Sequence, residues 1–153
     1  MQPGEMVVVR LKDGAKITRC LGSAGSRREG GDRIRISVGR NREARLPLDR
    51  IILATGVIAS NEDTEAFEHR CDAVASEIDL FGLWTVLRDQ STRLDLDDLT
   101  DLYWGPYYNL DQKVALLLSL DRSPLYFISD NGGNTRSGGA SNSPLRGWKG
   151  QVF

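Results

Sequence analysis

The chain has 153 residues, of which 20 are Lys or Arg, 21 are Asp or Glu and 40% are hydrophobic. This length suits one domain of ordinary size or two small ones. The sequence has no apolar run of about 18 residues, which excludes a membrane span and a signal peptide. We therefore expect a globular, cytoplasmic protein with no membrane partner.

Charge is divided unevenly along the sequence. Residues 1–56 carry a net charge of +6, residues 57–130 a net charge of −10 and residues 131–153 a net charge of +3. A swing of this size between neighbouring segments indicates two units that face different partners. The basic unit has the electrostatic character of a protein that binds a phosphate backbone.

The first residues predict a β hairpin. Glu5 to Leu11 is rich in β-branched residues, Lys12 to Gly14 is a turn signal, and Ala15 to Leu21 is expected to return as the second strand. Gly22 to Asp32 contains four glycines and no apolar residue larger than alanine, which predicts a mobile loop with two arginines at its tip.

The next segment alternates between basic and apolar residues. This alternation places Arg33 and Arg35 on one face of a strand and Ile34 and Ile36 on the other. A short strand at residues 43–46, a helical turn at residues 47–50 and a strand at residues 51–53 follow. Five short strands predict a small basic β-barrel over residues 1–56, of the SH3-like kind, with an OB-like barrel as the alternative.

The following segment is acidic and predicts helices. Ser60 is expected to cap a helix that begins at Asn61. Apolar residues then recur at spacings of three and four, which predicts that this first helix continues into the stripe that follows. The apolar residues of the first helix are Phe67, Cys71, Val74, Ile78 and Phe81, and those of the stripe that follows are Leu80, Leu83, Trp84 and Leu87.

Two shorter helices complete the predicted helical part. Asp95 is expected to cap the second helix, which Gly105 and Pro106 end. Asn109 and Gln112 form the pattern of a capping box and open the third helix. Residues 125–128 predict a compact strand that would be the wing of a winged helix.

The end of the sequence, residues 131–153, is rich in Gly, Ser and Asn. This composition predicts a tail in which residues 131–147 are disordered or a linker. The expected fold is therefore α+β: an SH3-like (or OB-like) barrel at residues 1–56, a three-helix winged-helix domain of helix-turn-helix type at residues 60–130, and the tail.

Ten cations in the basic unit are the main functional candidates. Arginine offers forked donors that match phosphate oxygens, and a barrel can present several of them together. The alternative is a face kept basic only for solubility. The density of cations favours RNA as the ligand. Binding would be mainly through phosphates, because this half has no run of aromatic residues on which bases could stack. The ten residues are Lys12, Lys16, Arg19, Arg27, Arg28, Arg33, Arg35, Arg40, Arg42 and Arg45.

Other residue clusters predict no catalytic or metal site. Four carboxylates lie close together but lack the glycine and distal glutamate of an EF-hand. His69 has no nucleophile in a recognisable setting, and the two cysteines, Cys20 and Cys71, are expected to be reduced thiols. The four carboxylates are Asp95, Asp97, Asp98 and Asp101.

An aromatic group borders the Gly105 turn. We expect Trp104, Tyr107 and Tyr108 to form the core between helices, with a base-stacking or partner-binding patch as the alternative.

Three blocks of sequence resemble the N-terminal region of ribonuclease II family enzymes, particularly the cyanobacterial and chloroplast type. They are GEMVVVRL with the later LPLDRIIL, then IDLFGLWTVLRDQSTRLDLDDLTDLYWG, then VALLLSLDRSPLYFISDNGG. The likeness spans residues 4 to about 133. It implies a small β domain and a winged helix placed ahead of cold-shock, catalytic and S1 domains, in a family that degrades RNA from 3′ to 5′. The family's magnesium-binding aspartate cluster has no counterpart in this chain, so no catalytic residue is carried over, and Mg²⁺ would belong to a catalytic domain that the chain lacks.

These observations lead to the hypothesis of a non-catalytic RNA-binding module that acts in RNA capture or decay. The alternative is a protein-interaction module or regulator in which the acidic helical domain docks a basic partner such as a nuclease. A DNA-binding regulator is disfavoured, because the presumed recognition helix from Leu110 to Leu120 has only one cation, Lys113, and carries Asp111 near its start.

Overall fold

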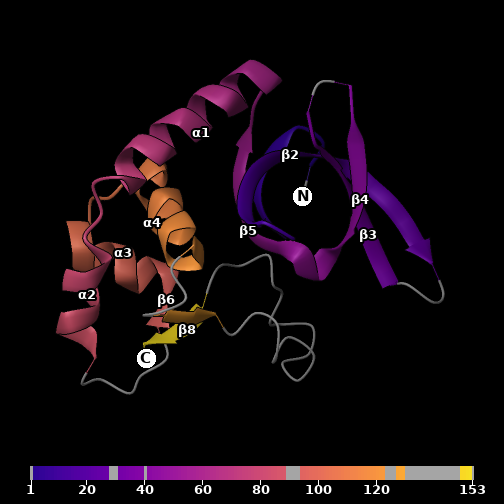
Figure 1. Cartoon of the computed structure of the whole chain (residues 1–153). Coiled ribbons are helices and arrows are strands. Elements are labelled where there is room, and N and C mark those ends of the chain that lie inside the picture. The colour runs from indigo at the N-terminus through magenta and orange to yellow at the C-terminus, as the bar shows by residue number, and fades with distance from the viewer. Residues whose placement is uncertain are drawn as a thin grey trace.

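The computed structural model describes residues 2–27, 31–39, 41–88, 94–122, 127–129 and 149–152. In these ranges the chain is a mixed α+β protein with a five-stranded antiparallel sheet, four helices and a small three-stranded sheet (Figure 1). None of the helices in this part of the chain has the length and apolar character needed to cross a membrane.

The large sheet forms the β unit, which comprises β1 to β5. Its spatial order is β4-β3-β2-β1-β5, and it curls strongly (Figure 1). β4 and β5 are its two edges, so hydrogen bonds do not close the sheet within the described residues. The strands are β1 (Glu5–Leu11), β2 (Gly14–Arg27), β3 (Gly31–Ser37), β4 (Glu43–Pro47) and β5 (Ile51–Ile58), with the predicted helical turn between β4 and β5 as the 3-10 helix η1 (Leu48–Arg50).

Strand β1 is buried on both faces. Val7 and Val9 face the inside of the curled sheet, where they pack with Ile34 and Ile36 of β3. Val8 faces the other way and belongs to the core shared with the helices. Two buried faces explain why β1 is a continuous apolar run rather than an alternating one.

The prediction of a loop from Gly22 to Asp32 is wrong for most of these residues. β2 continues to Arg27 and pairs with β3, with Ser23 opposite Ile34 and Arg27 opposite Gly31. Strand pairing uses backbone groups, and small residues tolerate the register shifts found here. Residues 28–30 lie outside the described part.

The helical unit has four helices rather than three. They are α1 (Asn61–Ala75), α2 (Leu80–Leu87), α3 (Leu96–Trp104) and α4 (Leu110–Arg122). The predicted first helix is interrupted after Ala75, because Asp79 accepts a hydrogen bond from the Gly82 N–H at 2.9 Å and gives α2 its own N-terminus. The apolar spacing alone did not reveal this break.

The predicted caps of the other helices are confirmed. Ser60 accepts from Asp63 N at 3.0 Å, and Asp95 accepts from Asp98 N at 2.9 Å. The capping box of α4 is complete: its two members exchange hydrogen bonds at 2.9 and 2.8 Å, from Asn109 N to Gln112 Oε1 and from Gln112 N to Asn109 Oδ1. Gly105, at φ +90°, ends α3 as expected.

A second sheet joins distant parts of the chain. It contains β6 (Leu94–Asp95), β7 (Phe127–Ser129) and β8 (Lys149–Val152) in the order β6-β8-β7. β8 lies in the predicted tail, beyond the segment expected to be disordered, and pairs with both neighbours. Its partners lie far away in sequence, so local composition did not indicate them. The predicted disordered segment, residues 131–147, lies outside the described residues.

The helices cover one face of β1 and the first half of β2. Phe67 and Cys71 of α1 and the buried side of α4 pack against Val8 and Ile17. Cys71 is therefore in the core shared with the helices, whereas Cys20 lies inside the curled sheet. Both are buried free thiols, as predicted.

Candidate nucleic-acid interface

Three predicted arginines gather on the outer face of β3 and β4. Ile34 and Ile36 point into the curled sheet, so Arg33 and Arg35 face outward. The register places Arg45 of β4 directly opposite Arg35, and Pro47 opposite Arg33. We call Arg33, Arg35 and Arg45 the arginine face.

Arg35 is the anchored member of this face. Its Nη2 donates a hydrogen bond to the Leu21 carbonyl at 3.1 Å, and its Nη1 lies 3.6 Å from Glu43 Oε2. Gly22 is its cross-strand partner on β2, where an added Cβ would lie 3.4 Å from Arg35 Nη2. The glycine thus leaves room for the guanidinium group.

The other two members are exposed, and no described carboxylate forms an ion pair with Arg33 or Arg45. Like charges directly opposite each other across two strands destabilise a sheet. A phosphate bound near Arg35 and Arg45 would relieve this repulsion, and guanidinium groups match its oxygens in a forked geometry. The arginine face therefore has the chemistry of an anion-binding surface.

Lys16 and Arg19 lie elsewhere, at a groove of about 390 Å³ between β2 and α1. Arg19 is used structurally: its Nε donates to the Ala59 carbonyl at 2.7 Å and its Nη1 to Asn61 Oδ1 at 2.8 Å. The opposite wall of the groove carries three carboxylates, from Glu62, Glu65 and Glu68. These carboxylates repel phosphates, so the groove does not extend the arginine face.

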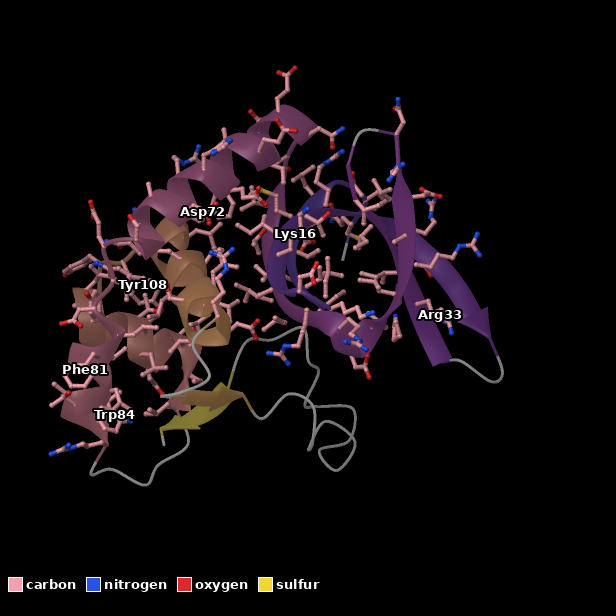
Figure 2. All side chains as sticks on the ribbon, in the orientation of Figure 1. Lys16, Arg33, Asp72, Phe81, Trp84 and Tyr108 are labelled. Carbon is pink, nitrogen blue, oxygen red and sulfur yellow. The ribbon has the colours of Figure 1, made fainter. Side chains whose placement is uncertain are left out.

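Figure 2 shows this separation. Lys16 lies between the sheet and α1, and Arg33 lies on the side of the β unit away from the helices. Lys12 is exposed in the turn between β1 and β2, and Arg42 is exposed just before β4. Arg27 is in β2, and Arg28 and Arg40 lie outside the described residues.

Sequence reasoning missed two residues that shape this region. Gly22 makes space beside Arg35, and a glycine inside a strand is the signal that could have identified it. Arg50, in η1 directly after β4, is a further exposed cation. Arg10 is basic too, but its guanidinium binds Asp121 of α4.

The predicted aromatic core near Gly105 is only partly present. Trp104 packs against the helical core, with its ring centroid 4.6 Å from that of Tyr103. Tyr107 is 97% exposed, so its predicted burial is wrong. The turn between α3 and α4 directs this side chain to solvent.

Tyr108 takes part in a polar cluster instead. Its hydroxyl donates to Asp97 Oδ1 at 2.7 Å, and Lys113 Nζ lies 2.8 Å from the same oxygen. Burial opposes ionisation of Asp97, but the hydrogen bonds from Lys113 and Tyr108 outweigh it and lower the pKa of Asp97. The hydrogen bond from Tyr108 to Asp97, together with a smaller effect of burial, raises the pKa of Tyr108 to about 12.

Besides the arginines, the chain has two buried free thiols and side chains of the kinds that ligate metals. No three His, Cys, Asp or Glu side chains there are placed to hold a metal ion. Burial, reinforced by the negative charge of Asp111, raises the pKa of Cys71 to about 12, so this thiol stays protonated at neutral pH.

Comparison of the chain with protein-family models, curated proteins and solved structures gives no match. Functional inference therefore depends on the arginine face and the geometry around it.

Proposed function

We propose that this chain is a non-catalytic RNA-binding module and that the arginine face contacts RNA phosphates. The observation that carries the proposal is the placement of Arg35 directly opposite Arg45, with Arg33 on the same outer face. Phosphate contacts of this kind position a nucleic acid without reading its sequence. Binding is therefore electrostatic and tolerant of sequence.

The fold supports a more specific form of this proposal. In it, the curled sheet is an SH3-like barrel and α2 to α4 form a winged helix. β6 precedes α3, and β7 and β8 follow α4, which is the chain order of a winged helix with its wing strands. The order β6-β8-β7 places the last strand between the other two, as a wing requires.

The resemblance to ribonuclease II enzymes adds a biological setting. We propose that the module belongs to the N-terminal accessory region of such a cytoplasmic 3′ to 5′ exoribonuclease and captures RNA for it. Hydrolysis and Mg²⁺ binding would then belong to another domain.

DNA reading by α4 receives no support from its contacts. Both of its cations are paired, Lys113 with Asp97 at 2.8 Å and Arg122 with Asp72 at 3.4 Å. Asp111 near its start is paired with Arg70 at 3.0 Å. Six of its residues are buried in the core. This helix acts as scaffold rather than as a recognition helix.

The test is binding of fluorescently labelled oligouridine over a salt series. Each lost phosphate contact to a single strand changes the slope of log K against log salt by about 0.7. The double variant Arg33→Ala, Arg45→Ala should flatten the slope by about 1.4 and weaken binding to every RNA sequence alike.

A matched control removes the same charge from the helical unit. Arg70→Ala with Arg122→Ala should leave the slope within about 0.3 of the parent value. If both double variants flatten the slope equally, net charge rather than the arginine face governs binding. If neither differs from the parent, the proposal is wrong.

A further inference from the structure

Helix α2 presents an uncharged surface to solvent. Leu83 and Leu87 are buried, whereas Phe81 is 59% exposed and Val86 is 64% exposed. No residue of this eight-residue helix carries a charge. A helix that is apolar on all sides is normally covered on all sides.

The shape of this surface suits a second helix. At 100° per residue, Gly82 and Thr85 lie between Phe81 and Val86 on the solvent side. These four residues are the α2 surface. Gly82 has no side chain, so between Phe81 and Val86 it lets a side chain of a partner approach the α2 backbone. Gly82 is also required by the cap, because an added Cβ there would collide with the Asp79 carboxylate.

The aromatic side of α2 is held in a defined arrangement. The rings of Phe81 and Trp84 have centroids 5.9 Å apart, and the Arg88 guanidinium lies 5.6 Å from the centre of the Trp84 ring. Figure 2 shows both rings on α2 at the end of the molecule away from the β unit. A docking partner therefore meets a preformed platform rather than mobile side chains.

Carboxylates lie at the N-terminal end of the α2 surface, and the exposed cation Arg88 lies at its C-terminal end. The cations on the other helices form ion pairs within the chain: Arg70 with Asp111, Lys113 with Asp97, and Arg122 with Asp72. Exposed carboxylates remain at the start of α2, on Glu77 and Asp79, and on α3, on Asp98 and Asp101. The two helices meet where Asp79 N donates to the Tyr103 hydroxyl at 3.0 Å.

We propose that the α2 surface docks a basic amphipathic helix of another protein. Apolar residues of that helix would cover Phe81 and Val86, and its Lys or Arg residues would lie near the carboxylates of α2 and α3. The net charge favours a basic partner. Residues 57–130 carry a net charge of −10, which repels RNA, an anionic membrane, and a second copy of this chain whose α2 faces the first.

The test uses the full chain and two designed peptides of equal length. Both have leucines on one helical face; one has lysines and the other glutamates on the opposite face. Fluorescence anisotropy of the labelled lysine peptide should show binding, and the glutamate peptide should not bind. Phe81→Ser with Val86→Ser should raise the Kd of the lysine peptide roughly tenfold, because apolar burial is lost.

The matched control removes two exposed apolar residues from another place. Val57→Ser with Ile58→Ser on β5, where these side chains are 40% and 54% exposed, should leave the Kd within about twofold. Asp98→Asn with Asp101→Asn changes no apolar residue and should also weaken the lysine peptide. Oligouridine binding by the Phe81→Ser, Val86→Ser variant should stay unchanged. Failure of the docking proposal is therefore distinguishable from failure of the proposed RNA function.

Several results would overturn the proposal. The α2 variant, shown by circular dichroism to be folded, could bind the lysine peptide as tightly as the parent; attraction would then be purely electrostatic. Both peptides could bind equally, which would remove the selection by charge. A dimer in sedimentation equilibrium that dissociates in the α2 variant would identify a second copy as the occupant.

Discussion

Asp121 of α4 holds Arg10 of β1 in a hydrogen-bonded ion pair. One carboxylate oxygen accepts from Arg10 Nε at 3.1 Å and Nη2 at 2.7 Å, and the other accepts from the Ala15 N–H at 2.9 Å. The Asp121 side chain is 9% exposed. A single carboxylate thus ties both strands of the first hairpin to the helical unit.

This contact predicts a large effect of Asp121→Ala on stability. The substitution leaves the Arg10 guanidinium and the Ala15 N–H without their partner in a largely buried place, which should cost about 2 kcal/mol of unfolding free energy. Urea denaturation measures it. Asp72→Ala is the control, because its pair with Arg122 is 3.4 Å long and half exposed, and should cost less than about 0.5 kcal/mol. Equal losses in the two variants would show that Asp121 does not join the units.

The arginine face predicts opposite effects of Arg45→Glu on stability and on RNA binding. A glutamate opposite Arg35 replaces a repulsive cross-strand pair with an attractive one, which should add a few tenths of a kcal/mol to stability at low salt. The same change puts a negative charge where we propose a phosphate binds. Thermal unfolding and oligouridine binding should therefore move in opposite directions.

Arg42→Glu makes the same charge change just outside β4, where the residue has no position in the β3–β4 register. It should leave thermal stability unchanged. Destabilisation by Arg45→Glu would mean that the two arginines do not repel each other in the free protein.

The Asp97–Tyr108 hydrogen bond predicts an unusual tyrosine titration. The pKa of Tyr108 is raised to about 12, so its phenol should ionise well above the usual range for tyrosine, as followed by ultraviolet absorbance. Asp97→Asn removes the negative acceptor and should return the pKa of Tyr108 to about 10. An unchanged titration in that variant would show that the bond is absent in solution.

The same pair gives stability a defined pH dependence. Tyr108 has a raised pKa when folded, so its contribution is present below about pH 10 and is lost as pH rises toward 12. Asp97 has a lowered pKa when folded, so its contribution is present above about pH 4 and is lost as pH falls further. Urea midpoints of the parent and Asp97→Asn should differ near neutrality, converge at acid pH, and move closer together as pH rises toward 12 and the Tyr108 contribution is lost.

The sequence by itself determined the features that depend on neighbours in the chain. Alternation identified the outward face of Arg33 and Arg35, because successive side chains of a strand point to opposite sides. Ser60, Asp95 and Asn109 identified three helix starts, since a cap acts on N–H groups two or three residues away.

Only the tertiary structure decided the features that depend on distant partners. β8 and the extension of β2 to Arg27 exist through backbone pairing with other strands, which small polar residues permit but do not announce. Register also decided which cations act together: it set Arg45 opposite Arg35, whereas Arg19 was taken by Ala59 and Asn61. The number of arginines in the sequence does not show which of them act together, because hydrogen bonds and charges depend on distances that only folding sets.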